Sequence, residues 1–302
     1  MIPLILPSTF YILHSQVTER DIKLILDVYK HRYLSTSQIV QLHFPSRQTA
    51  NRRLRALLEE GYLKGYKAPS IDDRIFHLTP KGAEIVASTL GVPPDALHFR
   101  RIADAAKDYY FLKHFLALNE FRIALTLGLK ATDALNLLGF IPEYYGEKTD
   151  KGGVVKYIRD FVCDIKDPEQ RINFTPDGVF ALEKDGNAAL FFLEIDRGTE
   201  ILSNPDKGVL KAVYFYYNYF ISGKYQRYTE DFKCQPFRGF RVLFVTTTET
   251  RLSNMQAAVS RERFKETRFV WLTTADKIQP ETILTNIWQS LDPSDANRYR
   301  IG

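Results

Sequence analysis

Three carboxylates lie at the ends of two short apolar runs, an arrangement that can bind a metal ion. Asp177 precedes the first run, and Glu194 and Asp196 lie at the end of the second. Between the runs, residues 184–187 read Lys-Asp-Gly-Asn, and the Asp-Gly pair favours a tight β-turn. The pattern therefore predicts a β-hairpin that brings carboxylates of its two strands together.

The position of the turn decides which residues of the hairpin face each other. A turn centred on Asp185 and Gly186 places Asp177 opposite Glu194, and a turn centred one residue later places Asp177 opposite Asp196. In both registers the three carboxylates share one face of the sheet, because side chains alternate between the faces. Neighbouring carboxylates repel one another unless protons or a cation neutralise them. Ligands that are all oxygen suit Mg²⁺ or Mn²⁺, so we predict a site for one of these ions.

The setting of the second run favours a metal site over a solvated acidic face. Acidic side chains are common on exposed faces, and spacing alone does not separate the two interpretations. Four consecutive apolar residues, Leu190 to Leu193, precede Glu194. Such a run predicts a strand that is covered on both faces, as in sheets flanked by helices. Carboxylates on a covered strand need a partner, because a buried charge without one is costly.

The composition bounds the class of protein and its compartment. At 302 residues, with 45% hydrophobic and 25% charged residues, the chain has room for two folded domains. A net charge of +5 is compatible with a polyanionic partner without requiring one. Cys163 and Cys234 lie far apart, which indicates a disulfide-free, cytoplasmic protein. No apolar run approaches the length of a membrane span, so no membrane partner is expected.

The N-terminal region predicts three helices, and the third has a polar face suited to DNA. Helices are expected over residues 18–32, 35–42 and 46–60. In the third helix, Ala50 and Leu54 belong to an apolar stripe. The polar side chains that lie away from this stripe are those of Arg47, Gln48, Asn51, Arg52 and Arg55. This layout is typical of a recognition helix, whose first turns enter the major groove.

Two short strands, over residues 62–66 and 74–78, predict a β-wing after the third helix. The sequence Leu-Thr-Pro-Lys-Gly at 78–82 resembles that of many winged-helix regulators. A winged helix can also serve protein contacts, but the Arg-rich helix face favours double-stranded DNA as the partner. The wing residues placed to contact phosphate or the minor groove are Lys64, Lys67 and Arg74.

A Gly-Val-Pro-Pro linker at residues 91–94 separates two predicted domains, 1–95 and 96–302. The second domain is predicted to be α/β (α+β), with a mixed sheet flanked by helices. Its helices are expected near residues 104–129, 207–221, 251–264 and 283–291, and its further strands near 140–145, 241–246 and 269–273.

The acidic hairpin on this order of elements resembles the PD-(D/E)XK nuclease superfamily. The residues that carry the resemblance are Pro176-Asp177 followed by Glu194-x-Asp196. With the winged helix, the string 194–200 (Glu-Ile-Asp-Arg-Gly-Thr-Glu) and Lys211-x-x-Tyr214, the chain resembles the replication-relaxation family of plasmids and other mobile elements. The resemblance implies DNA binding and a role in the replication or relaxation of plasmid DNA.

The resemblance also implies roles for single residues. Asp177 and Glu194 would correspond to the metal ligands of the superfamily, and Asp196 lies beside them. Glu120, on the helix before the sheet, could match the superfamily's helix acid, and Glu143 is the alternative. The nuclease pattern has lysine where Asp196 stands, so a catalytic lysine would have to come from elsewhere. The helix after the hairpin offers such residues, Lys207 and Lys211.

Two functions are compatible with these residues. In the first, which we favour, the winged helix selects a site and a Mg²⁺-dependent centre nicks or cuts nearby DNA. In the second, the protein is a non-catalytic transcriptional or replication regulator. Its nuclease-like domain would then form a homodimer or clamp the DNA.

Two other features predict no separate function. The sequence 146–149, Gly-Glu-Lys-Thr, departs from a phosphate-binding loop because Glu147 separates the glycine from the lysine. No nucleotide cofactor is therefore expected. The aromatic run 214–220 could stack on bases. A helical stripe nevertheless predicts core packing for it, and the residues of this stripe are Leu210, Val213, Tyr214, Tyr217 and Ile221.

Overall fold

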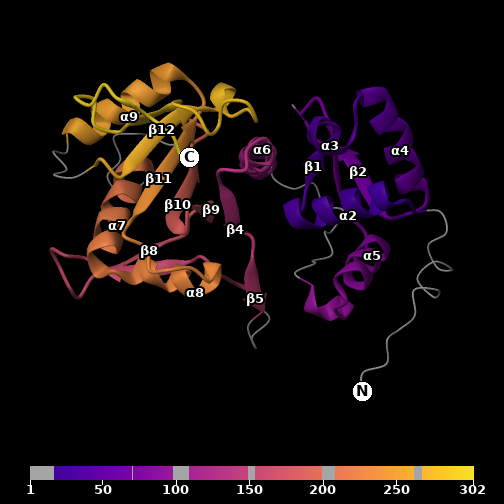
Figure 1. Cartoon of the computed structure of the whole chain (residues 1–302), viewed down its shortest axis with the longest axis horizontal. Helices are drawn as coiled ribbons and strands as arrows, with labels where there is room; N and C mark the ends of the chain where they lie inside the picture. The colour runs from indigo at the N-terminus through magenta and orange to yellow at the C-terminus, as the bar shows by residue number, and fades with distance from the viewer. Residues whose placement is uncertain (1–16, 70, 98–108, 149–153, 199–207, 262–266) are drawn as a thin grey trace. The chain divides into compact units, whose positions relative to one another are not determined.

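A computed structural model describes residues 17–69, 71–97, 109–148, 154–198, 208–261 and 267–302 (Figure 1). Lys207, Thr149 and the end of the string 194–200 lie outside the described residues. The chain divides into two compact units, Met1–Leu116 and Ala117–Gly302, which are described separately. The domain boundary predicted at residue 95 stays a prediction.

The first unit combines helices with a small antiparallel sheet. Its sheet has the strand order β1-β3-β2. The elements are α2 (Glu19–His31), β1 (Leu34–Ser35), α3 (Thr36–His43), α4 (Arg47–Glu59), β2 (Leu63–Lys67), β3 (Arg74–Leu78), α5 (Pro80–Leu90) and the short helix η1 (Pro94–Ala96). The three helices and two strands predicted for residues 18–78 are confirmed, each within two residues of the predicted bounds.

Local sequence explains where these helices begin. Thr18, Ser35, Ser46 and Thr79 each accept a hydrogen bond from a backbone N–H of the helix that follows. Their hydroxyls satisfy N–H groups that have no partner inside the helix. Helix α5 ends at Gly91, whose left-handed backbone (φ +67°) is favourable for glycine.

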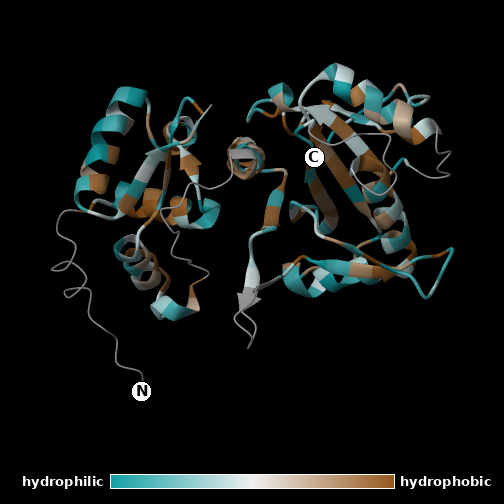
Figure 2. Cartoon of the chain, turned by 180° about the vertical axis from the view of Figure 1, so that it is seen from behind, coloured by the Kyte–Doolittle hydropathy of each residue, from teal (hydrophilic) through white to brown (hydrophobic). Residues whose placement is uncertain are grey.

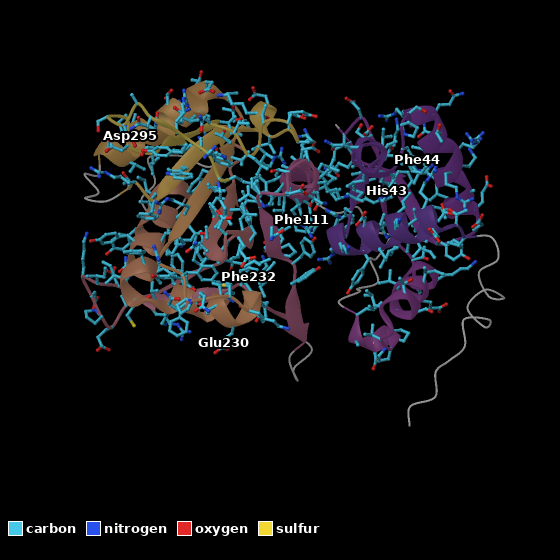
Figure 3. The ribbon with its side chains drawn as sticks, in the orientation of Figure 1. His43, Phe44, Phe111, Glu230, Phe232 and Asp295 are labelled. Atoms are coloured by element: carbon cyan, nitrogen blue, oxygen red, sulfur yellow. The ribbon has the colours of Figure 1, made fainter. Side chains whose placement is uncertain are left out.

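A buried ion pair and ring contacts tie the helices of the first unit together. Asp21 of α2 is fully buried and accepts two hydrogen bonds from Arg53 of α4, at 2.7 and 2.8 Å. At the end of α3, His43 Nε2 lies 3.1 Å from Asp27 Oδ2, and the guanidinium of Arg20 lies over the ring of Phe44 (Figure 3). These contacts fix α4 and the end of α3 against α2.

The second unit is built on a mixed seven-stranded sheet of order β14-β13-β12-β11-β10-β9-β4. Strands β10, β11 and β12 run parallel to one another, and the other neighbours are antiparallel. The strands are β4 (Asn136–Pro142), β9 (Gly178–Lys184), β10 (Asn187–Ile195), β11 (Phe240–Thr246), β12 (Val270–Thr274), β13 (Trp288–Ser290) and β14 (Arg298–Tyr299). The chain is therefore a mixed α/β protein, as predicted.

Helices cover both faces of this sheet (Figure 1). Helices α7 (Gly208–Ser222) and α9 (Glu249–Arg261) pack on one face, which we call the α7 face. Residues of α6 (Tyr109–Lys130) from position 118 onward pack on the other, the α6 face. The strands of the sheet are largely apolar, brown in Figure 2.

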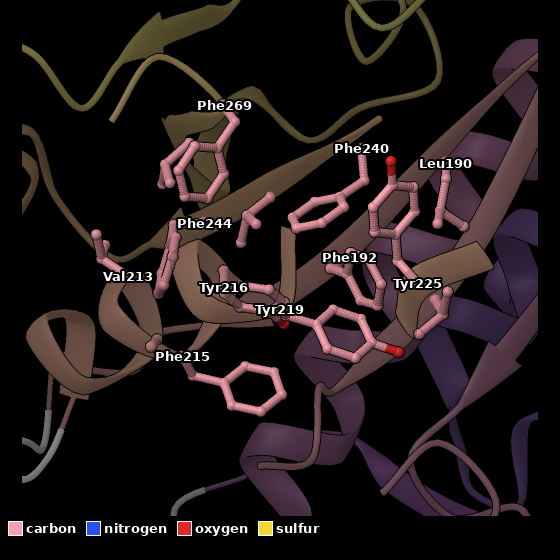
Figure 4. Packing of buried hydrophobic residues seen from close by; sticks show 14 of the residues in the cluster. Leu190, Phe192, Val213, Phe215, Tyr216, Tyr219, Tyr225, Phe240, Phe244 and Phe269 are labelled. Atoms are coloured by element: carbon pink, nitrogen blue, oxygen red, sulfur yellow. The ribbon is translucent and has the colours of Figure 1, made fainter. Parts of the chain in front are cut away.

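Strand β10 is buried on both faces, as its sequence predicts. Leu190 and Phe192 belong to the core on the α7 face, and Phe191 and Leu193 belong to the core on the α6 face. On the α7 face, rings of the aromatic run 214–220 pack around Phe192 (Figure 4). The prediction of core packing is confirmed in part: Phe215, Tyr216 and Tyr219 are buried, whereas Tyr214 and Tyr217 are only half-buried and Ile221 is exposed, so the buried stripe differs from the predicted one.

Shorter elements complete the second unit. The α7 face also receives η2 (Lys224–Arg227) and α8 (Tyr228–Phe232). Two small antiparallel sheets pair β5 with β6 and β7 with β8. Their strands are β5 (Gly146–Lys148), β6 (Val154–Lys156), β7 (Asp160–Cys163) and β8 (Arg171–Phe174), and the short helix η3 (Ala275–Lys277) follows β12.

The helix predicted over residues 283–291 is wrong. Residues 288–290 form β13, which pairs with β12 and with β14. Ile283, Trp288 and Leu291 are fully buried, and a short apolar run of this kind fits either a helix or a strand. The edge of β12 offers backbone hydrogen-bond partners, and pairing with this distant strand makes residues 288–290 a strand and not a helix. Among the described residues, no helix combines the length and the apolar character needed to cross a membrane.

Candidate functional site

The hairpin of β9 and β10 places Asp177 opposite Glu194. Its pairs run from Asn187 with Lys184 to Leu193 with Gly178, so the turn is centred on Asp185 and Gly186. Both turn residues have positive φ (49° and 75°), as the Asp-Gly pair of a type I′ turn requires. Asp177 continues the ladder, since its N–H donates to Leu193 O at 3.1 Å. The first of the two predicted registers is therefore confirmed.

Strand β4 adds a third carboxylate at the same level of the sheet. Pro142 pairs with Gly178, and the next N–H, that of Glu143, donates to Asp177 O at 2.9 Å. A carboxylate oxygen of Glu143 lies within 4.8 Å of one of Asp177. Alternation along the strands puts Glu143, Asp177 and Glu194 on the α7 face. We call these three residues the acidic row.

A buried tyrosine of α7 holds Glu194. The hydroxyl of Tyr216 donates to Glu194 Oε1, and the Tyr216 ring is fully buried against Phe192 and Phe174. Burial, followed by the charges of Glu194 and Asp177, raises the pKa of Tyr216 well above its usual value. The hydroxyl is therefore a proton donor throughout the physiological range.

Asp177 and Glu143 are held by different groups. One carboxylate oxygen of Asp177 accepts a hydrogen bond from the N–H of Ile195 at 2.6 Å, which fixes it against the end of β10. The ammonium group of Lys156, on β6, donates to Glu143 Oε2. Lys156 is 44% exposed and Glu143 only 14%, so the cation lies on the solvent side of the carboxylate.

Asp196 is bound by an arginine of α9. Arg251 donates from Nε to Asp196 Oδ2 and from Nη2 to Oδ1, both at 3.0 Å, and Thr246 Oγ1 donates to Oδ2 at 2.6 Å. Such a two-pronged, charge-assisted pair is strong and fixes both side chains. Where the nuclease pattern has a lysine, this chain therefore has an aspartate whose charge is balanced by Arg251.

In the first unit, α4 presents a basic face. The five predicted reading residues, Arg47, Gln48, Asn51, Arg52 and Arg55, are all exposed. Arg53, between them in sequence, points inward to Asp21. On the hairpin of β2 and β3, Lys64, Lys67 and Arg74 are also exposed.

The model of the replication-relaxation family matches residues 26–233 of the chain. The chain belongs to the replication-relaxation family. No curated protein matches it. Membership suggests a role in the replication of mobile elements. The matched range contains α4, the acidic row and Tyr216, whereas Arg251 lies beyond it.

The remaining predicted residues of this replication-relaxation protein lie outside the acidic row. Lys211 is exposed on α7, and the α7 residue that contacts Glu194 is Tyr216, five positions later. Glu120 lies on α6, which packs on the opposite face of the sheet. The metal-binding and catalytic roles of Lys211, Glu120 and Asp196 stay predictions.

The site of this family member contains four residues that sequence reasoning missed: Tyr216, Lys156, Thr246 and Arg251. Arg251 is 55 residues from Asp196 in sequence, and no local pattern connects them. Tyr216 was visible only as a member of the aromatic run 214–220, which does not identify the partner of its hydroxyl. Lys156 follows the polar stretch 148–153, which carries no recognisable motif.

Proposed function

We propose that this protein binds duplex DNA through its first unit and nicks or cuts DNA with a divalent cation at the acidic row. The observation that carries the proposal is the acidic row itself. Three neighbouring strands each supply one carboxylate at the same level, and two of the three lie within 4.8 Å. A protein gains nothing in stability from gathering like charges, so a shared cation explains the arrangement best.

The order of elements supports a winged-helix interpretation of the first unit. Three helices precede a two-stranded hairpin, and β1 completes a three-stranded sheet. In such domains the third helix enters the major groove, and here α4 carries five exposed polar side chains. Arginine, glutamine and asparagine can read base edges, while Lys64 and Lys67 of the hairpin can bind phosphates.

The residues of the acidic row fit a hard divalent cation. Glu143, Asp177 and Glu194 would hold it through carboxylate oxygens, the ligands that Mg²⁺ and Mn²⁺ prefer. When bound, the cation would polarise a phosphate and lower the pKa of a water molecule. Tyr216 and the N–H of Ile195 keep two of the carboxylates in place. Lys156 lies beside Glu143 on the solvent side, where it would attract the DNA backbone.

A second function, that of a non-catalytic regulator, is favoured by one observation. Lys156 and Arg251 already neutralise Glu143 and Asp196, as in an ion-pair network that serves the fold. In that case the second unit would form a homodimer or clamp DNA, and α4 would still bind DNA.

A plasmid assay tests the catalytic proposal. Wild-type protein is incubated with supercoiled plasmid and Mg²⁺ or Mn²⁺, and nicked or linear product is measured. Asp177→Asn should abolish product, because it removes a charge from the acidic row. Asp185→Asn is the matched control, since it makes the same charge change at the exposed turn of the same hairpin. Absence of product with wild type, or equal product with Asp177→Asn, would contradict catalysis.

A binding assay separates the two functions. Arg52→Gln and Arg55→Gln should weaken binding to duplex DNA under either function, and Lys23→Gln, exposed on α2, should leave it unchanged. Binding without product supports the regulator, and no effect of the two α4 variants would retire both functions.

A further inference from the structure

We propose that Asp73, in the loop between β2 and β3, restrains Arg47 of α4 and thereby weakens sequence-independent binding to DNA. The inference rests on the proposed DNA-binding role of α4. Arg47 then has a different role from the other arginines of that face. It contacts base edges from a fixed position and does not bind phosphates as a mobile side chain.

Asp73 joins two helices of the first unit through its two carboxylate oxygens. Arg47 Nη2 donates to Asp73 Oδ1, and the backbone N–H of Ser37, in the first turn of α3, donates to Oδ2 at 2.8 Å. Arg47 Nη1 also donates to Ser37 Oγ at 3.1 Å. The guanidinium is thus fixed at two points. Only 15% of the Asp73 side chain is exposed, against 53% for Arg47.

Asp73 is charged at neutral pH and balances the charge of Arg47. Burial alone would raise the pKa of Asp73, but the hydrogen bonds from Ser37 and Arg47 outweigh it and lower the pKa. Removing the hydrogen-bond donors of a partly buried carboxylate also costs free energy, because the charge is left without partners. Breaking the contact so that Arg47 can pair with a DNA phosphate therefore costs free energy.

The two other arginines of the α4 face are in a different state. Over the described part of the chain, neither Arg52 nor Arg55 pairs with a carboxylate, and both are exposed. They can follow phosphates along any duplex, which gives affinity without sequence information. Arg47 has five N–H donors, of which the Asp73 and Ser37 contacts use two. Its remaining donors can bind a base edge while the pair with Asp73 stays intact.

The expected consequence of releasing Arg47 is stronger binding without regard to sequence. In Asp73→Asn, the guanidinium would be free to pair with a DNA phosphate. One added phosphate contact steepens the dependence of log affinity on log salt by about 0.9. Between about 0.05 and 0.2 M salt, this slope changes the affinity relative to the control by roughly 3.5-fold.

The experiment compares Asp73→Asn with Asp72→Asn on a random-sequence duplex of about 30 base pairs, by fluorescence anisotropy over that salt range. Asp72 is the adjacent residue and is exposed, and among the described residues no hydrogen bond or ion pair joins it to Arg47. The two variants change the net charge equally at nearly the same place. Asp73→Asn should bind more tightly than Asp72→Asn and with the steeper slope. In an Arg47→Gln background the two variants should behave alike.

Equal affinity and slope for the two aspartate variants would overturn the inference while leaving the proposed function intact. If Arg52→Gln and Arg55→Gln do not weaken binding, the proposed DNA-binding role fails, and the inference fails with it. Should Asp73→Asn unfold the first unit, Ser37→Ala provides the second test. It removes one Arg47 contact but keeps the backbone N–H that binds Asp73, so it should shift the slope in the same direction by less.

Discussion

Replacement of Tyr216 by phenylalanine should weaken divalent-cation binding at the acidic row while the second unit stays folded. The change removes one hydroxyl, which donates to Glu194 Oε1, and leaves the ring in its contacts with Phe174 and Phe192. Glu194 then loses the donor that fixes its carboxylate beside Asp177. The chain offers a matched control one turn later, because the buried Tyr219 donates in the same way to Asp160, away from the acidic row.

The magnitude follows from the two contacts. A hydrogen bond to a charged group contributes about 1.5–3 kcal/mol to stability, so both variants should lower the free energy of unfolding by that order. Asp160 also lies 3.4 Å from Arg227 Nε and keeps this partner in Tyr219→Phe. Removal of a group that holds a metal ligand in place typically weakens metal affinity by about 10–100-fold. We therefore expect at least a tenfold weaker Kd for Mn²⁺ in Tyr216→Phe, about 1.4 kcal/mol.

Titration calorimetry with Mn²⁺ measures the affinity, and urea unfolding with and without Mn²⁺ provides a second readout. At a Mn²⁺ concentration of about 100 times the wild-type Kd, binding should stabilise wild type by about 2.7 kcal/mol. A tenfold weaker variant should gain only about 1.4 kcal/mol under the same conditions. Tyr219→Phe should match wild type in both readouts of Mn²⁺ binding. If Tyr216→Phe binds Mn²⁺ as Tyr219→Phe does, Glu194 is not a ligand that Tyr216 positions.

Three further predictions concern stability, each measured by urea unfolding. Asp21→Asn should cost about 1.5–3 kcal/mol, because it removes the charge of a fully buried carboxylate that accepts two hydrogen bonds from Arg53, while Glu60 still lies 3.8 Å from Arg53. Burial raises the pKa of Asp21, but its hydrogen bonds lower the pKa by more, so the folded-state pKa lies below the usual value. The stabilisation by Asp21 is therefore present above about pH 4 and is lost as the pH falls below that value. If the variant loses stability at acid pH just as wild type does, this prediction is contradicted. Arg251→Gln and Asp196→Asn should each destabilise the second unit, and the double variant should cost less than their sum; strictly additive costs would show that the pair is not coupled. Gly178→Ala should cost about 1–3 kcal/mol, because its Cβ would come within 2.7 Å of an aromatic ring atom; a neutral effect would mean that the ring moves freely.

The hairpin was predictable from sequence because its determinants are local. The Asp-Gly turn sets the register, and alternation then fixes which side chains share a face. Asp177 and Glu194 were found in this way, and the helix caps Thr18 and Ser46 were equally readable. Glu143 was recognised only as an alternative, since its place depends on β4 pairing with β9 across an intervening 35 residues.

The partners of the acidic residues were not predictable. Asp196 was predicted to be a further metal ligand because alternation along the strand places it on the same face as Glu194. Its carboxylate instead binds Arg251 on α9, the helix that follows the next strand of the sheet, β11. Lys211 was proposed from its position after the hairpin, yet the helical period turns it to solvent and turns Tyr216 to Glu194. Residues 288–290 form a strand for a similar reason, since the edge of β12 and not the local pattern decides their conformation.

The central claim is that Glu143, Asp177 and Glu194 hold a divalent cation. Crystals soaked in Mn²⁺, with anomalous diffraction recorded at the manganese edge, test it most directly. We predict one strong anomalous peak between these three carboxylates, and its loss in Asp177→Asn but not in Asp185→Asn. No peak at saturating Mn²⁺, or a peak that does not involve Asp177, would contradict the claim.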